Sequence, residues 1–132
     1  LAQNTLKHPL VYNGDIFSLA DYNNCQQKFP ETKDWMLGRG ILMNPFLPDE
    51  INNIQISKDE KWEKLKEFHQ LIFEGYSENM DNEGNVLNKM QQFWSLFSFN
   101  FPNQKKIFKG IKKSKNITNF NQEANKAFLS FY

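Results

Sequence analysis

The fold of this chain is decided by two related stretches, LVYNGDI at residues 10–16 and WMLGRGILMNP at residues 35–45. In each, a short apolar run is followed at once by a turn that contains glycine and a charged residue. The segment between them, residues 18–29, can form one helix. The order strand, turn, helix, strand, turn, helix predicts two successive units of a parallel β/α fold. Such folds keep their ligand sites just after the strands.

The two turns have the residue types of a phosphate site. Gly14, Gly38 and Gly40 carry no side chain that would hold a ligand away from the backbone. Residues 41–43 can begin a short helix, whose first N–H groups we expect to be unpaired and directed at a ligand. Arg39 is the single arginine among sixteen basic residues, and its planar fork suits a phosphate better than a lysine does. Either turn alone fits an ordinary strand end equally well, whereas both together favour a ligand site.

The NGD turn at residues 13–15 and the GRG-x-x-x-NP pattern at residues 38–45 resemble the last two barrel strands of the tRNA-dihydrouridine synthases. The resemblance covers about residues 9–47 with specific motifs. It implies an FMN-dependent enzyme with a (β/α)8 barrel and a C-terminal helical domain, which reduces uridine in tRNA and uses NADPH to recharge the flavin. It assigns to FMN binding the residues Asn13, Gly14, Asp15, Gly38 and Arg39.

The length limits what the chain can contain. An eight-unit barrel needs about 200 residues or more, and this chain has 132. We therefore expect the C-terminal part of a longer protein, with a mainly α fold. In this prediction a C-terminal four-helix bundle, residues 55–132, follows a β-α-β-α remnant of a truncated (β/α)8 TIM barrel, residues 1–54. Two strands without neighbours leave open edges, so we expect self-association through them.

The helix at residues 18–29 is predicted to begin at Ser18 as N-cap, with Asp21 as a weaker capping-box partner. Its apolar residues recur at helical spacing and predict a buried stripe. The stripe consists of Leu19, Tyr22, Cys25 and Phe29. Cys25 lies on this stripe, so we interpret it as a packing residue and not as a nucleophile.

The second half of the chain has a purely helical period. A capping box, SKDE at residues 57–60, opens the first helix, and Pro102 is expected at the first position of the third. The apolar faces are Trp62, Leu65, Phe68, Leu71/Ile72 and Tyr76 in the first helix; Val86, Met90, Phe93/Trp94 and Phe97 in the second; Phe120, Ala124, Ala127/Phe128 and Phe131 in the last. For His69, beside the first face, we expect a helix-boundary hydrogen bond and no catalytic role.

Residues 101–116 hold six lysines and no acidic residue. On a helix, Lys105, Lys109, Lys112 and Lys113 share one face, opposite Ile107, Phe108 and Ile111. A one-signed face of this kind fits a nucleic-acid backbone, although a merely soluble face is an equally good account of the pattern alone. The helical domain of the resembled family helps to hold tRNA, which assigns tRNA binding to Lys105, Lys106, Lys109, Lys112 and Lys113.

Composition excludes several classes of function. The net charge is +1, and the single cysteine rules out an internal disulfide and a cysteine-cluster metal site. We expect no metal. No apolar run is long enough to span a membrane and no signal-peptide pattern precedes the first expected strand, so the expected location is the cytoplasm without a membrane partner.

By the resemblance, a flavin hydride goes to uracil while a cysteine of an earlier barrel loop acts as acid. Cys25 does not match that motif, so we expect no catalytic residue in this chain and no activity of the chain alone. Two alternatives stay open. One is the C-terminal part of another FMN-dependent TIM-barrel oxidoreductase. The other is a self-standing helical module that binds RNA or protein.

Overall fold

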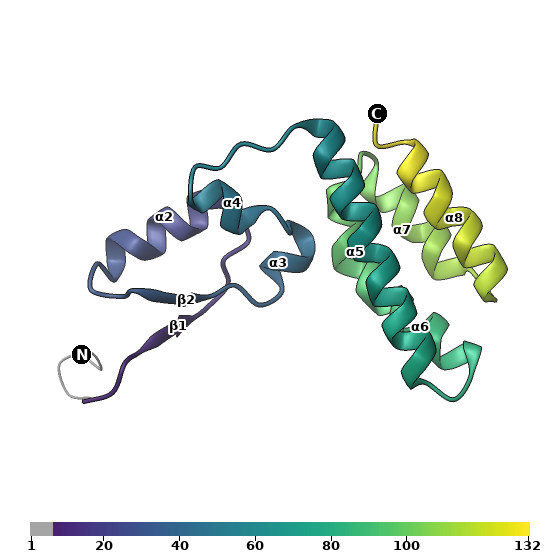
Figure 1. Ribbon diagram of the computed structural model, residues 1–132, viewed down its shortest axis with the longest axis horizontal. Helices are drawn as coiled ribbons and strands as arrows, with labels where there is room; N and C mark the ends of the chain where they lie inside the picture. The colour runs from purple at the N-terminus through teal and green to yellow at the C-terminus, as the bar shows by residue number, and fades with distance from the viewer. Residues whose placement is uncertain (1–6) are drawn as a thin grey trace. The chain divides into compact units, whose positions relative to one another are not determined.

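The computed structural model describes residues 7–132, which belong to two compact units, Leu1–Gln55 and Ile56–Tyr132 (Figure 1). Helices make up 65% of the described residues, which contain one sheet, of two parallel strands. The prediction of a mainly α fold is thus confirmed.

The first unit has the predicted strand–helix order. Its elements are β1 (Val11–Asn13), α2 (Leu19–Lys28), β2 (Asp34–Met36), α3 (Gly40–Met43) and α4 (Leu47–Ile51). Strands β1 and β2 pair in parallel, with Val11 opposite Asp34 and Asn13 opposite Met36. The carboxyl ends of the two strands, and hence the two glycine turns, lie at the same edge of the sheet (Figure 1).

Helix α2 begins where the sequence predicts. The Ser18 hydroxyl accepts a hydrogen bond from the Asp21 amide at 3.1 Å, and the Asp21 carboxylate accepts one from the Phe17 amide at 3.0 Å. A side-chain hydrogen bond with Ser18, the larger cause, and the bond from the Phe17 amide lower the pKa of Asp21, because both stabilise its charged carboxylate. Two of the donors left open at the helix start are therefore satisfied locally.

The prediction of a buried stripe along α2 is wrong. No residue of the helix is buried, and Leu19 and Phe29 are 37% and 40% exposed. Two strands of three residues offer too little surface to cover a ten-residue helix. Cys25 is half-buried, and its thiol donates to the Tyr12 hydroxyl at a sulfur–oxygen distance of 3.7 Å, which raises the pKa of Tyr12.

The core of the first unit lies under the turns instead. Ile16, just after β1, is fully buried, as is Leu47 at the start of α4, and Phe46 is 6% exposed. Burying such side chains stabilises a fold by roughly 1.5–3 kcal/mol each. The segments after the strands are thus the best-anchored part of the unit.

The second unit is a bundle of four helices. They are α5 (Lys58–Asn79), α6 (Glu83–Phe97), α7 (Gln104–Lys113) and α8 (Ile117–Leu129), and a short 3-10 turn, η1 (Ser98–Asn100), follows α6. Ser57, Asn82 and Asn116 cap three of them, each accepting from the amide three residues on. The return bond of the predicted capping box is absent from the bonds of the described residues, where Glu60 pairs with Lys64 at 3.0 Å.

Aromatic rings dominate the core of the bundle. Trp94, Phe97 and Phe120 are fully buried, and Phe101 and Phe128 are at most 6% exposed. Trp94 stacks on Phe101 with ring centroids 5.4 Å apart, and Phe101 meets Phe128 edge-on at 5.1 Å. Such pairs contribute about 0.5–1.5 kcal/mol each beyond their buried area. The predicted apolar face of α6 is confirmed, since all its members are buried.

Three predictions for the bundle are wrong. Leu71 is 59% exposed, because the buried line of α5 runs through Leu65 and His69. Pro102 precedes α7 by two residues, and Asn103, at a φ of 56°, turns the chain into the helix. Phe131 follows α8 instead of belonging to it, and it packs edge-on against Phe101.

His69 lies inside the aromatic core and not at a helix boundary. Its ring is within 6.5 Å, between centroids, of five aromatic rings, those of Phe93, Trp94, Phe97, Phe120 and Phe128. Its Nε2 atom is buried and has no hydrogen-bond partner among the described residues. Burial therefore disfavours the charged ring and lowers the pKa of His69 from 6.5 to about 4.

This burial predicts an acid-sensitive bundle. Above pH 6.5 the imidazole is neutral in both states and stability does not depend on it. Below pH 6.5 His69 becomes protonated in the unfolded protein, whereas in the folded protein it stays neutral until the pH falls to about 4. Lowering the pH from 7.5 to 5.0 should therefore reduce the free energy of unfolding by about 2 kcal/mol. Denaturant unfolding of the wild type and of His69→Phe at both pH values measures this change in the free energy of unfolding. An equal loss in both proteins would contradict the prediction.

Candidate functional site

The two glycine turns meet at one hollow of about 420 Å³ after strands β1 and β2. Its lining comes equally from both turns. The residues are Asn13, Gly14, Asp15, Phe17, Met36, Leu37, Gly38 and Arg39. All five residues that the sequence assigns to FMN binding are therefore brought together, although 23 positions separate Asp15 from Gly38.

Arg39 spans the two turns. Its Nη2 atom donates to Asp15 Oδ1 at 2.9 Å, and its guanidinium carbon lies 5.9 Å from the centre of the Phe17 ring. Both charged side chains are about two-thirds exposed, so the ion pair contributes little to stability. Its effect is to orient the guanidinium, which has five N–H donors and leaves most of them available to an anion.

A close backbone contact sets the spacing of the turns. At Gly40 a β-carbon would overlap the carbonyl oxygen of Ile16 and press on the Phe17 backbone. Only glycine therefore allows α3 to begin against the segment that follows β1. Gly38, two residues earlier, has a φ of 50°, a left-handed conformation that side chains disfavour. The GRG sequence thus combines a sharp turn, a cation and a close approach.

The expectation of unpaired N–H groups at the start of α3 is wrong. The amides of Gly40, Ile41 and Leu42 donate to the carbonyls three residues back, in a tight turn. Only the Gly38 and Arg39 amides of this turn have no acceptor among residues 7–132. The positive character of the site therefore comes mainly from the Arg39 guanidinium.

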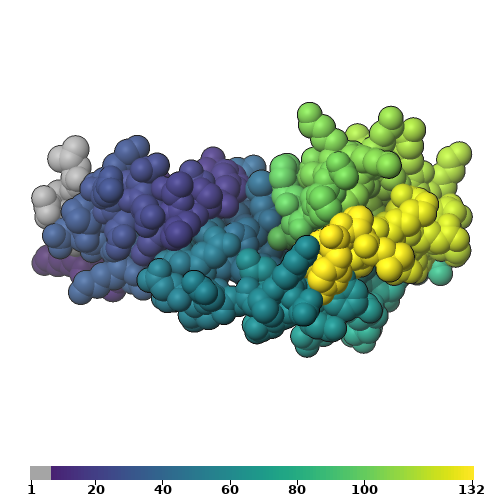
Figure 2. Space-filling view, turned by 90° about the horizontal axis from the view of Figure 1, so that it is seen from above, coloured from purple at the N-terminus to yellow at the C-terminus, as the bar shows by residue number. Residues whose placement is uncertain are grey.

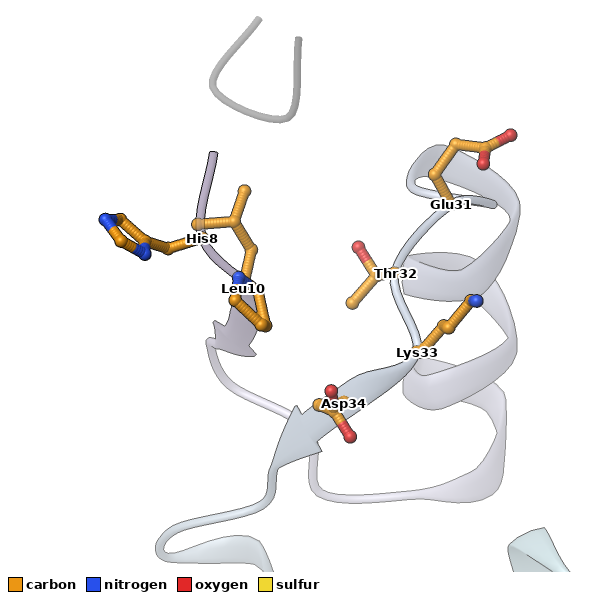
Figure 3. Close-up of a pocket in the computed structure, with 7 residues that line it drawn as sticks. His8, Leu10, Glu31, Thr32, Lys33 and Asp34 are labelled. Carbon is orange, nitrogen blue, oxygen red and sulfur yellow. The ribbon is translucent and has the colours of Figure 1, made fainter. Parts of the chain in front are cut away.

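The opposite end of the two strands has a different character. A hollow of about 230 Å³ lies between the entry to β1 and the entry to β2 (Figure 3). In this view the His8 imidazole and the Glu31 carboxylate point away from the space between them. Polar groups thus do not converge there, and it is not a candidate for catalysis or for ligand binding.

The lysines of α7 lie on its exposed side and its apolar residues face inward, as the sequence predicts. The side chains of Lys105, Lys106, Lys109, Lys112 and Lys113 are exposed, whereas Ile111 is fully buried. The atoms of α7 lie at the surface of the second unit, in light green in Figure 2. None of these lysines forms an ion pair with another described residue. We call them, with Lys115 in the following turn, the lysine face.

Comparison with known proteins decides the family. A family model described as dihydrouridine synthase matches residues 2–130. The chain belongs to the dihydrouridine synthase family. No curated protein and no solved structure matches it. Membership makes it a protein of a family of oxidoreductases in tRNA processing and confirms the family resemblance.

Two further properties of the dihydrouridine synthase chain concern metal sites and membrane-spanning helices. Among residues 7–132 no three metal-ligating side chains come together as a metal site. In the same range, no helix has both the length and the apolar character needed to cross a membrane.

Sequence reasoning missed one residue of the site and gave another the wrong role. Phe17 lines the hollow and carries the Arg39 guanidinium on its ring; only its position, two residues after Asp15, could have indicated this. Gly40 was expected to face a ligand, but the structure places it against the Ile16 backbone. That distinction depends on a contact between residues 24 positions apart, which sequence spacing does not reveal.

Replacing Gly40 by alanine tests the contact. The added methyl must push α3 away from Ile16, so we expect a loss of about 3 kcal/mol or more of local stability in the first unit. Gly75 in α5 is the matched control, because a β-carbon there meets nothing within 4 Å, and Gly75→Ala should be neutral or stabilising by up to about 1 kcal/mol. Hydrogen exchange, resolved by peptide, measures both. Unchanged protection of residues 11–51 in Gly40→Ala would contradict the contact.

Proposed function

We propose that this chain provides FMN-phosphate contacts and a tRNA-holding helical domain to a flavin-dependent tRNA-dihydrouridine synthase, which reduces uridine to 5,6-dihydrouridine in tRNA. One observation carries the proposal. Five residues chosen from sequence, Asn13, Gly14, Asp15, Gly38 and Arg39, line one hollow, and the last of them is the chain's single arginine.

The residues of the hollow fit a phosphate monoester. Gly38 leaves open space where a side chain would stand, Gly14 makes room for the Tyr12 ring, and the Gly38 and Arg39 amides are open donors among the described residues. The Arg39 fork supplies the charge and can bind two phosphate oxygens at once. Asp15, itself an anion, is better suited to holding the guanidinium in place than to touching phosphate.

Bound FMN would supply the hydride chemistry of uridine reduction, with NADPH as the reductant of the intact enzyme. The residues of this chain would hold the cofactor by its phosphate and so fix where its reactive ring lies. We assign no catalytic residue to the chain. Cys25 donates to Tyr12 behind the strands, so we give it a packing role and expect no activity of this chain alone.

Strands β1 and β2 are proposed to be part of a (β/α)8 barrel, with residues 1–54 as the barrel portion and residues 55–132 as the tRNA-recognition domain. Val11 and Met36 support this, because they lie on one face of the sheet and are 54% and 51% exposed. The outer edges of β1 and β2, which pair with no further described strand, would also allow self-association. A cytoplasmic location is part of the proposal, since tRNA is its substrate.

The tRNA role rests on the lysine face. Its ammonium groups are exposed and free of ion pairs with described residues, so they can replace the counterions of a phosphate backbone. Such contacts hold and orient an RNA without reading its sequence. The target uridine would then leave its stack to reach the flavin.

The phosphate site predicts a preference for FMN over riboflavin, which lacks only the phosphate. Charge-assisted hydrogen bonds contribute about 1.5–3 kcal/mol each, so FMN should bind the chain at least about tenfold more tightly. Arg39→Ala should remove most of this preference, and Arg39→Lys should keep part of it. Flavin fluorescence titrations measure the affinities of the wild type and both variants for FMN and for riboflavin. Equal binding of FMN and riboflavin by the wild type would refute the site.

The tRNA role predicts a charge-dependent loss of binding. Replacing Lys105, Lys109 and Lys112 together by glutamate should weaken binding of an unmodified tRNA transcript. The slope of log affinity against log salt should fall by about 0.9 for each phosphate contact that is lost. The charge-matched control replaces Lys58, Lys64 and Lys66 of α5. Filter binding across a salt series compares them, and an equal response of both triple variants would contradict a dedicated face.

A further inference from the structure

Gln91 of α6 holds the end of the lysine face in place. Its side-chain amide nitrogen lies 3.1 Å from the carbonyl oxygen of Ile111, 3.3 Å from that of Lys112 and 3.0 Å from that of Ser114. The side chain is half-buried between α6 and the turn from α7 to α8. A single neutral donor group thus serves three acceptors at the C-terminus of α7.

These three carbonyls lie at the C-terminal end of α7, two in its last turn and one at the C-cap residue Ser114. The last four carbonyls of a helix have no amide to accept from and carry its partial negative charge. At the end of α7 the Ser114 hydroxyl donates to the Gly110 carbonyl at 3.1 Å, and the Ser114 amide donates to Ile111 at 3.2 Å. Gln91 adds a bond from a different helix, so the turn is tied to the bundle core.

Lysine side chains near a helix C-terminus can otherwise bind the last carbonyls themselves. Lys112, Lys113 and Lys115 are within reach along the chain, yet the carbonyls of Ile111, Lys112 and Ser114 are bound to Gln91. The side chains of Lys112, Lys113 and Lys115 consequently stay exposed, and their ammonium groups are available to an external anion.

We propose that Gln91 is a positioning residue for RNA binding: it occupies the C-terminal carbonyls of α7 and thereby presents Lys112, Lys113 and Lys115 to the phosphate backbone. The proposal rests on the function proposed above for the lysine face. Gln91 itself does not contact RNA. It acts by fixing the backbone of the α7–α8 turn and by leaving the lysines as the only free cations there among the described residues.

The test compares Gln91→Met, which keeps the length of the side chain but removes its donors, with Gln92→Met at the exposed neighbouring position. In the full chain, Gln91→Met should bind an unmodified tRNA transcript roughly three- to tenfold more weakly, with a salt slope smaller by about 1. Amides 113–116 should exchange faster. Gln92→Met should match the wild type in affinity, slope and exchange.

A second variant separates positioning from simple loss of fold. Gln91→Lys keeps donors for the three carbonyls and should retain the wild-type protection of the turn and the wild-type salt slope, even if Gln91→Met unfolds. Loss of tRNA binding in a folded Gln91→Lys would overturn the inference. So would wild-type binding by Gln91→Met while the triple glutamate variant is weakened. If the triple glutamate variant also binds normally, it is the proposed function that fails.

Discussion

The first unit depends on a contact in which α3 begins so close to the Ile16 carbonyl that position 40 has no room for a β-carbon. This contact joins the turn after β1 to the turn after β2 more tightly than the short strand pairing alone. Ile16 itself and Leu47, seven residues after Gly40, have fully buried side chains, which anchor both turns. The hollow between the turns is a consequence of that spacing.

The positive charge that the hollow offers to an anion comes from one side chain. The Arg39 guanidinium is held by Asp15, lies near Phe17 and follows Gly38, where the turn has open space in place of a side chain. A weak, exposed ion pair suits this purpose, because it orients Arg39 at little cost when an anion takes its remaining donors. In the second unit the same logic recurs on a larger scale. Gln91 takes up backbone acceptors with a neutral amide, so that the neighbouring lysines keep their charge exposed.

Local signals predicted much of this fold and of the site. Ser18 and Ser57 start their helices as expected, and the turns around Asn13 and Arg39 meet because the carboxyl ends of parallel strands share an edge. The failures involve long-range packing. The α2 stripe was expected to be buried, but the sheet is too small to cover it. His69 was expected at a boundary, but rings from α6 and α8 enclose it. The spacing of residues along the chain does not reveal either of these environments.

Mapping the amide shifts of the chain by NMR as FMN is added tests the central claim most directly. The amides of Asn13, Gly14 and Asp15 should shift together with those of Gly38 and Arg39, since one phosphate would lie against both turns. Amides of the helical bundle should not move. Shifts confined to one turn, or centred elsewhere in the chain, would contradict a phosphate site built from the two turns.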